Sequence, residues 1–269
     1  MNKKMMLILV MTSMLLMAYG SSYGVSRVLE FDLAVDDSWS WSMTDEETTA
    51  CDELSINKND ELTYTLTAEV TEDNGNGTFD LELTTTNVYL SEDGGQPQSQ
   101  SGGSDDLTMT QGRGRWTVEP DGTLLLPGSV PSGCNMGTAA GDQTGAFITT
   151  AVDVYDTWYS SRKVTPYGES EQTVLATSEL LEWTTFDGRN VAKIETIWTQ
   201  PISVYDSVKG TLTAGDINVT EMMWFDYENH VVAKSITYSE GTLLVTTSES
   251  YPDNEYSIDV SSTSTQILD

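Results

Sequence analysis

The sequence predicts a mainly β protein whose antiparallel strands form curved sheets, as a half-barrel or a sandwich, in two similar halves. Three observations predict this fold class. Apolar and polar residues alternate with a period of two along much of the chain, turns rich in Gly, Asn and Asp separate the alternating runs, and threonine is abundant at the polar positions. Because successive side chains of a strand point to opposite faces, each run has one face suited to a core.

In the first half, the clearest alternating run covers residues 61–70, where Leu, Tyr, Leu, Ala and Val occupy every second position. The sequence Asn-Gly-Asn-Gly at 74–77 follows, and these residue types tolerate the positive φ angles of a hairpin turn. Alternation resumes at Phe79. Further along, Asp121-Gly122 joins a strand around Trp116 to an aliphatic strand. We therefore expect a series of hairpins.

Two stretches of the first half are expected to be loops. Residues 91–106 (SEDGGQPQSQSGGSDD) are rich in Gly, Ser and Gln and carry no apolar anchor, which is typical of a flexible loop. Residues 128–145 are rich in small residues and contain Cys134. The chain is thus expected to form a β-rich half over 25–145, with a flexible loop at 91–106, and a second β-rich half over 146–269.

In the second half, the turns Asp187-Gly188 and Glu228-Asn229 each join two alternating runs. Residues 256–260 alternate as a terminal strand. Residues 173–181 also fit a helical spacing, but a strand over 178–185 competes for the same residues. The second half is therefore expected to be mostly antiparallel β as well.

Residues 1–20 are expected to be a secretory signal peptide. Two lysines precede an apolar run over 5–18, and small residues stand before a cleavage point after Gly20. Fourteen helical residues span only about 21 Å of a roughly 30 Å hydrocarbon core, which disfavours a membrane anchor. We expect a secreted protein, either periplasmic or extracellular at the cell surface, with no integral membrane association after cleavage.

The cysteine content fits this expectation. Cys51 and Cys134 are the only cysteines, and an even count in an exported protein favours a disulfide between them. Such a bond would close a loop of about 84 residues and add about 4–5 kcal/mol in the chain-entropy model. Two buried thiols are the alternative. A cysteine-based metal site is disfavoured, because the chain has no Cys-x-x-Cys and a single histidine.

An internal repeat is indicated by an Asp-[Ser/Thr]-Trp motif that occurs at 37–39 and again at 156–158. Further along each half, a tryptophan stands five residues before a turn. The residues that define the repeat are Asp37, Trp39, Asp156, Trp158, Trp116 and Trp224. The repeat predicts two similar curved sheets of about 120 residues that share one core. Chance recurrence of a tryptophan and a turn in a β-rich sequence is the alternative.

These motifs resemble those of a group of uncharacterised exported prokaryotic proteins. The shared features are the Asp-[Ser/Thr]-Trp entry, the hairpins and the sequence WFDYENHVVAKS at 224–235. The usual pattern there is aromatic-Asp-x-x-x-Gly-x-[Leu/Val], and His230 stands in place of its Gly. Such proteins are distantly similar to LolA/LppX-like half-barrel lipoprotein carriers, although this chain lacks a lipobox Cys. The resemblance implies a curved sheet around a hydrophobic cavity that binds an acyl chain or a lipidated partner, and it carries over no catalytic residue.

The charge of the chain excludes several partners. There are 42 acidic and 12 basic residues, so the net charge is −30, and removal of the two lysines of the signal peptide makes it −32. Binding to nucleic acid needs clustered Lys and Arg, and adsorption to an anionic membrane is also disfavoured. A hydrophobic content of 38% with 9% aromatics argues against disorder. The acidic residues are spread along the chain, which favours solubility or adaptation to salt over one dedicated binding face.

Signals for catalysis and metal binding are weak. His230 follows Asp226 and Glu228, yet a histidine in a solvated turn is far more common than a general base oriented by a carboxylate. Calcium ligands are available around the turn 74–77 and at 105–106, but neither spacing matches a known calcium loop. No cofactor, metal site or catalytic residue is therefore expected.

The leading hypothesis is an exported, non-enzymatic β-sheet protein that binds a hydrophobic or lipid-like ligand, with an envelope protein as another possible class of partner. Aromatic and methionine residues on the alternating strands are the ligand-cavity candidates, and an ordinary sandwich core is their alternative use. These candidates are Met109, Trp183, Trp198, Met223 and Phe225. A structural or adhesive module of the cell surface is the second hypothesis. A secreted hydrolase that uses paired carboxylates is the third.

Overall fold

The computed structural model describes residues 26–52, 54–112, 116–118, 147, 150–164, 172–206, 210–247 and 255–269. The predicted signal peptide 1–20, the loop 128–145 with Cys134, and the turn Asp121-Gly122 lie outside the described residues. The disulfide between Cys51 and Cys134 therefore stays a prediction. Cys51 itself ends the first strand with its side chain buried.

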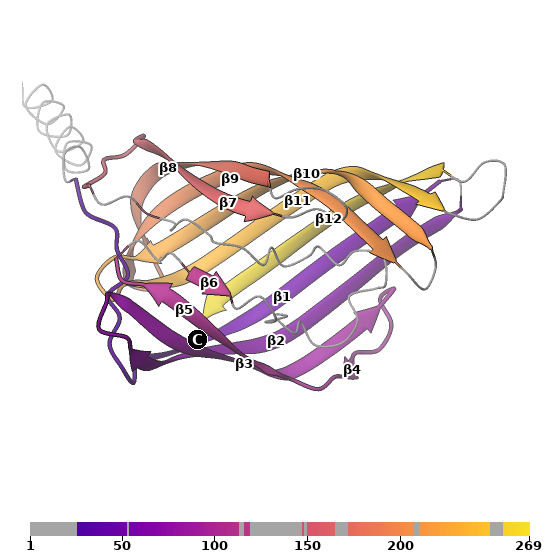
Figure 1. Ribbon diagram of the computed structural model, residues 1–269. Coiled ribbons are helices and arrows are strands. Elements are labelled where there is room, and N and C mark those ends of the chain that lie inside the picture. The colour runs from indigo at the N-terminus through magenta and orange to yellow at the C-terminus, as the bar shows by residue number, and fades with distance from the viewer. Residues whose placement is uncertain are drawn as a thin grey trace, which may run out of the picture.

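All described secondary structure is β, which confirms the predicted fold class. The strands are β1 (Ser38–Cys51), β2 (Ile56–Asp73), β3 (Thr78–Glu92), β4 (Gln98–Ser99), β5 (Ser104–Thr110), β6 (Trp116–Val118), β7 (Thr157–Val164), β8 (Gln172–Phe186), β9 (Arg189–Asp206), β10 (Thr211–Asp226), β11 (Val231–Thr247) and β12 (Glu255–Leu268). They form one curved antiparallel sheet that is not closed (Figure 1). The described residues include no helix that could cross a membrane.

The order of the strands explains how two halves make one sheet. The sheet runs β6-β5-β3-β2-β1-β12-β11-β10-β9-β8-β7, and the short β4 pairs with β3 outside this path. The chain thus moves from β1 outward to the edge at β6, resumes at the opposite edge with β7, and returns strand by strand to β12. β12 then pairs with β1 over ten residue pairs, from Trp41–Leu268 to Ala50–Asp259. This pairing joins the two halves.

The long strands each bury one of their two faces, as the alternation predicts. On β1, Trp41 and Met43 are buried whereas Ser42 and Glu46 are exposed. Buried side chains of strands that are not neighbours, such as Phe79 of β3 and Val231 of β11, belong to one cluster, which places them on the inner side of the curve. We call this side the inner face and the opposite side the outer face.

The inner face carries three apolar clusters. The first cluster lies over β1, β2, β3 and β5, and it includes Trp41, Ala68, Val70, Phe79, Leu81 and Leu107. The second lies over β7 to β10, and it includes Trp158, Leu180, Ala192, Ile194, Met223 and Phe225. The third lies near the other end of β9 to β12, and it includes Ile202, Ile217, Val219, Leu243, Ile258 and Val260.

The Asp-[Ser/Thr]-Trp motif forms the same turn in both halves. The Asp37 carboxylate accepts a hydrogen bond from the Ala34 backbone N–H at 2.8 Å, and the Asp37 N–H donates to the Ala34 carbonyl at 3.0 Å. Asp156 makes the same two bonds with Asp153, also at 2.8 and 3.0 Å. The aspartate therefore closes a turn that leads into the first strand of each half.

The two turns are also attached to the sheet in the same way. Asp36 and Tyr155, each preceding the motif aspartate, have φ angles of +73° and +72°. Their N–H groups donate to the carbonyls of Val70 on β2 and Leu180 on β8, at 3.0 and 2.7 Å. The equivalence of the two halves thus extends from the sequence motif to backbone geometry.

The two other tryptophans of the predicted repeat occupy different places. Trp116 lies on β6, the edge strand of the first half, whereas Trp224 lies on β10, between β9 and β11. Trp224 is next to Phe225, whose side chain is buried on the inner face, so Trp224 points to the outer face.

The stretch 91–106, expected to be a flexible loop, contains regular structure instead. β3 continues to Glu92, β4 follows, and β5 begins at Ser104. Thr85 donates to the Gly103 carbonyl at 2.8 Å, and a Cβ on Gly102 would lie 1.9 Å from the Thr85 carbonyl oxygen. The small residues that suggested a loop permit this close backbone approach, because a glycine has no side chain to accommodate.

Replacing either motif aspartate should destabilise the protein by similar amounts. We expect Asp37→Ala and Asp156→Ala each to lower the free energy of unfolding by about 1 kcal/mol, because each leaves a backbone N–H without its carboxylate acceptor. Urea denaturation measures this effect. Asp36→Asn removes the same charge beside the turn and should change little. A loss for one aspartate and none for the other would contradict the equivalence of the halves.

Candidate functional site

A short N-terminal segment, Arg27–Leu33, crosses the gap between the two free edges of the sheet at one end. We call it the strap. Arg27 exchanges two backbone hydrogen bonds with Val152, just before β7, at 3.1 and 2.8 Å. Phe31 exchanges two with Gly112, just after β5, at 2.8 and 2.9 Å. The strap is the indigo segment at the left end of the sheet in Figure 1, and it links edges that do not pair with each other.

Side chains of the strap pack onto the inner face. Leu29 is buried in the second cluster and Leu33 in the first, with exposed fractions of 3% and 5%. Between them, the ring of Phe31 lies 5.1 Å from that of Phe225 and 5.3 Å from that of Phe147. The strap thus connects the cores of the two halves at this end of the sheet.

Beside the strap lies an apolar cavity of about 210 Å³. The strap, β1, β2, β3, β5, β11, β12 and the turn before β11 all contribute to its walls. Among its lining side chains are Trp39, Trp41, Leu66, Leu83, Met109 and Val232. Among the described residues that line it, His230 and Gln266 are the polar ones. Several of these large apolar side chains, including Trp39 and Leu66, are only half-buried because they face this hollow.

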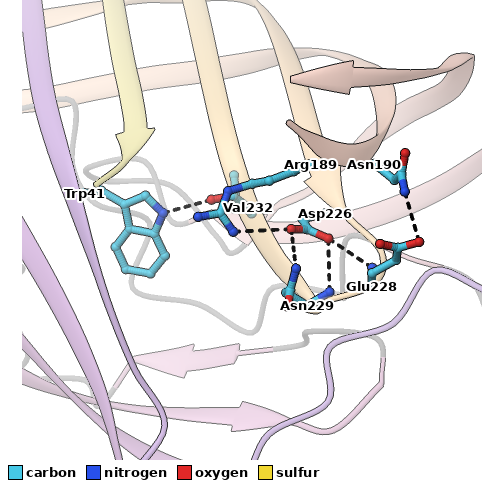
Figure 2. A network of polar contacts seen from close by, with 7 residues as sticks. All are labelled: Trp41, Arg189, Asn190, Asp226, Glu228, Asn229 and Val232. Atoms are coloured by element: carbon cyan, nitrogen blue, oxygen red, sulfur yellow. Dashed lines mark hydrogen bonds and ion pairs between the residues drawn. The ribbon is translucent and has the colours of Figure 1, made fainter. Parts of the chain in front are cut away.

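The turn between β10 and β11 forms one wall of the cavity and is held by Asp226. Its side chain has an exposed fraction of 0%. Oδ1 accepts from the N–H groups of Glu228 and Asn229 at 3.0 Å, and Oδ2 accepts from Asn229 Nδ2 at 2.8 Å and pairs with Arg189 at 3.4 Å (Figure 2). The carboxylate therefore fixes the backbone that presents the following residues to the cavity.

These contacts control the pKa of Asp226. Burial alone would raise it, but the hydrogen bonds from Asn229, from the Glu228 N–H and from Arg189 outweigh burial, so the pKa lies below its ordinary value. Asp226 is thus ionised at neutral pH, and the energy of its hydrogen bonds contributes to folding. The sequence WFDYENHVVAKS accordingly encodes a structural turn, with Asp226 as its organising residue.

His230 ends this turn and contacts the strap. Its Nδ1 lies 2.8 Å from the Glu30 carbonyl oxygen. Because a carbonyl only accepts, Nδ1 carries the proton of this bond. The φ angle of His230 is +57°, a left-handed conformation that glycine adopts more readily than other residues. His230 therefore connects the turn to the strap, and within the described part of the chain its hydrogen-bond partner is a backbone carbonyl.

A second contact of the strap with the same turn involves Arg27. Its guanidinium carbon lies 4.4 Å from the centre of the Tyr227 ring and 5.8 Å from that of Trp183. At the cavity itself, the Trp41 Nε1–H donates to the Val232 carbonyl at 2.9 Å, as Figure 2 also shows. Contacts between segments far apart in the sequence thus hold the cavity walls together.

A row of polar side chains crosses the inner face next to the cavity. The row consists of direct cross-strand partners, one from each of six neighbouring strands: Asp45, Ser264, Thr237, Glu221, Thr196 and Ser178. We call it the polar row. It spans about 24 Å, given a spacing of about 4.8 Å between strands. It separates the first and second clusters from the third.

Hydrogen bonds partly satisfy the polar row and its surroundings. Ser178 and Thr196 share a bond of 2.9 Å, and Ser235 donates to Glu221 at 3.0 Å. Asp45 interacts with the hydroxyls of Ser264 and Tyr64. Yet in the part of the chain that the structure describes, Asp45 Oδ1 is buried without any hydrogen-bond partner.

Burial and charge shift the pKa values at this end of the row. Burial raises the pKa of Asp45, and the hydrogen bonds from Ser264 and Tyr64 only partly offset it. The pKa of Tyr64 is raised by its own burial and by the neighbouring Asp45 carboxylate. A buried carboxylate such as that of Asp45 is stabilised by a hydrogen-bond donor or a positive charge beside it.

The five ligand-cavity candidates lie in three places. Met109 lines the cavity. Met223 and Phe225 are buried in the second cluster, and Trp183 packs against that cluster. Trp198 packs against the third cluster, beyond the polar row. The structure thus brings Met223, Phe225 and Trp183 together and places Met109 in the neighbouring cavity.

The sequence reasoning did not find several residues of the site. Phe31 and Leu33 of the strap stand outside any alternating run, so periodicity gives no signal for them. Trp41 and Asp45 do have a signal in the sequence. Trp39, Trp41, Met43 and Asp45 occupy alternate positions and so lie on one face of β1, where the aspartate interrupts a row of apolar residues.

Within the described residues, no group of three or more His, Cys, Asp or Glu side chains is arranged to hold a metal ion. No known protein-family model matches the chain, and a search of curated proteins finds no matching relative.

Replacing Asp226 should weaken the whole turn. We expect Asp226→Asn to lower the free energy of unfolding by about 2–3 kcal/mol at pH 7, because the ion pair and the charge-assisted hydrogen bonds are lost from a buried position. The folded-state pKa of Asp226 is depressed, so this advantage of the native protein is present above the ordinary pKa of 3.8 and is lost as the pH falls through the lower folded pKa.

Urea denaturation of both proteins at pH 7 and near pH 3 measures this dependence. Asp187→Asn, an exposed aspartate of the neighbouring β8–β9 turn, is the matched control and should show almost no effect. An equal loss for Asp226→Asn at both pH values would contradict the ionised role of the carboxylate.

Proposed function

We propose that this protein binds a hydrophobic, lipid-like ligand in the cavity beside the strap. The single observation that supports the proposal most is the cavity itself, about 210 Å³ of space lined almost entirely by apolar side chains. An apolar cavity of about 150 Å³ is large enough to take up benzene, so this one has room for a small apolar group or part of an alkyl chain.

The shape of the core supports binding over simple packing. Protein interiors are close-packed, and voids larger than a water molecule are few. Here two tryptophans, Trp39 and Trp41, face a hollow while the neighbouring Ala68 and Val70 are buried at 3% and 0% exposure. Filling the hollow with hydrocarbon would remove half-buried apolar surface from water, which is favourable by about 25 cal/mol per Å².

The chemistry of the walls favours binding over catalysis. Of the described lining residues, His230 and Gln266 are polar, and the Nδ1 atom of His230 already bonds to the strap. A hydrolase with paired carboxylates would need two of them in a cleft with the substrate. We infer a carrier or binding protein, and the predicted signal peptide supports a role outside the cytoplasm.

The proposal predicts that a neutral alkyl quencher reaches the tryptophans of the cavity. We expect 11-bromo-1-undecanol to quench the fluorescence of Trp39 and Trp41, because the bromine-bearing end would enter the apolar cavity. Titration of the purified protein with the quencher measures binding. Ala68→Leu, which adds bulk to the cavity wall, should weaken the binding by about tenfold or more.

Thr67→Leu is the matched control, because Thr67 is the neighbour of Ala68 on β2 and points to the outer face. It adds similar apolar bulk and should leave the binding unchanged. Trp39→Phe and Trp41→Phe should each remove part of the quenched signal, whereas Trp198→Phe, beyond the polar row, should not. Quenching that is equal in Ala68→Leu and in the native protein would overturn the cavity as the binding site.

A further inference from the structure

We propose that the ligand is a cationic amphiphile, whose ammonium group binds at the Asp45 end of the polar row while its hydrocarbon part occupies the cavity. This inference rests on the proposed function and adds the chemistry of the head group. Three features of the inner face carry it: the continuity of the polar row, its distance from the cavity, and the sign of its charges.

The polar row is unusual for the face on which it lies. On β9 and β10 the row interrupts large apolar inner-face residues, Met223 and Ile194 toward the strap and Val219 toward the other end. On β11 and β12 the adjacent inner-face positions are polar as well, among them Ser235, Ser239 and Gln266. Six consecutive strands nevertheless place a hydroxyl or a carboxylate at the same register position. Burying polar groups costs stability unless they are hydrogen-bonded, so the row is suited to a ligand that supplies the remaining bonds.

The row lies within reach of a molecule in the cavity. Gln266 lines the cavity, and Ser264 of the polar row is two residues away on the same face of β12. Two residues of a strand extend about 7 Å. Asp45 is the direct cross-strand partner of Ser264. An amphiphile whose tail fills the cavity can therefore place its polar end beside Asp45 with a short linking segment.

The charges of the row select a positive head group. Asp45 and Glu221 are its two ionisable members, and Glu47 lies one position further along β1 on the same face. Neither the polar row nor the cross-strand rows on its two sides contain a Lys or Arg. A carboxylate only accepts hydrogen bonds, and the buried Asp45 Oδ1 has no partner among the described residues.

An ammonium group supplies what this end of the row lacks. It brings donors to the buried oxygen and a positive charge to a partly desolvated carboxylate, where hydrogen bonds to charged groups are strongest. A fatty acid would place a second carboxylate beside Asp45, which is repulsive. A neutral alcohol offers a single donor and no charge. The order of affinity should therefore be amine, then alcohol, then fatty acid.

Three probes with equal tails test this order: decylamine, decanol and decanoate, at pH 7 and below their micelle concentrations, by displacement of the brominated quencher. We expect decylamine to bind about tenfold or more tighter than decanol, and decanoate to bind most weakly. Asp45→Asn should remove the advantage of decylamine while leaving the affinity for decanol unchanged, which also shows that the variant is folded.

Asp259→Asn is the matched control, because Asp259 lies on the outer face of β12, accepts from Thr242, and its replacement changes the net charge equally. It should leave the preference for decylamine intact. Equal effects of the two substitutions would attribute the preference to the overall negative charge and overturn the site. Decanol or decanoate binding as tightly as decylamine would also overturn the inference while leaving the proposed function in place. No binding of any probe, with no quenching by 11-bromo-1-undecanol, would remove the proposed function itself.

Discussion

The long strands each bury one face, and the whole inner surface depends on the register that keeps this alternation in phase across the sheet. A shift of one residue in any strand pair would turn its buried side chains outward and bring its polar ones inward. The same register aligns Asp45 with Ser264 and continues through four more strands to Ser178. The strand register thus determines the positions of both the apolar clusters and the polar row, and a change of register would displace both.

The open edges of the sheet give the strap its importance. In a closed barrel the edge strands pair with each other, whereas here β6 and β7 remain apart and Arg27–Leu33 bridges the two sides at one end. The strap holds the turn before β11 through His230 and Tyr227, and Asp226 in turn holds the backbone of that turn. The cavity wall therefore depends on the strap and on the turn before β11, which contact each other and both pack on the sheet.

Alternation and turn chemistry were sufficient to predict the antiparallel strands, because both are local properties of the sequence. The repeat predicted two similar curved sheets, whereas the strands of both halves form one continuous sheet. The Asp-[Ser/Thr]-Trp motif was similarly informative, since Asp37 and Asp156 form the same turn. The cavity was less accessible to prediction. Its walls combine the strap with strands of both halves, and their meeting depends on the curvature of the sheet. The polar row could not be predicted from the sequence, because serine and threonine are also common at exposed strand positions. Asp45 is the exception, since it follows Trp39, Trp41 and Met43 at the alternate positions of β1 that are otherwise apolar.

The pairing of β1 with β12 also has a consequence for how the protein folds. Ser42 and Asp269, which share a hydrogen bond at the end of this pairing, are 227 residues apart in the chain. Hairpins such as β2–β3 and β10–β11 can form from local segments, but one edge of β1 stays open until the last strand of the chain arrives. Contacts of such large sequence separation are slow to form, because the entropy of closing the loop is lost before the contact is gained. We therefore expect the pairing of β12 with β1 to be a late step of folding, during which the edge of β1 stays exposed.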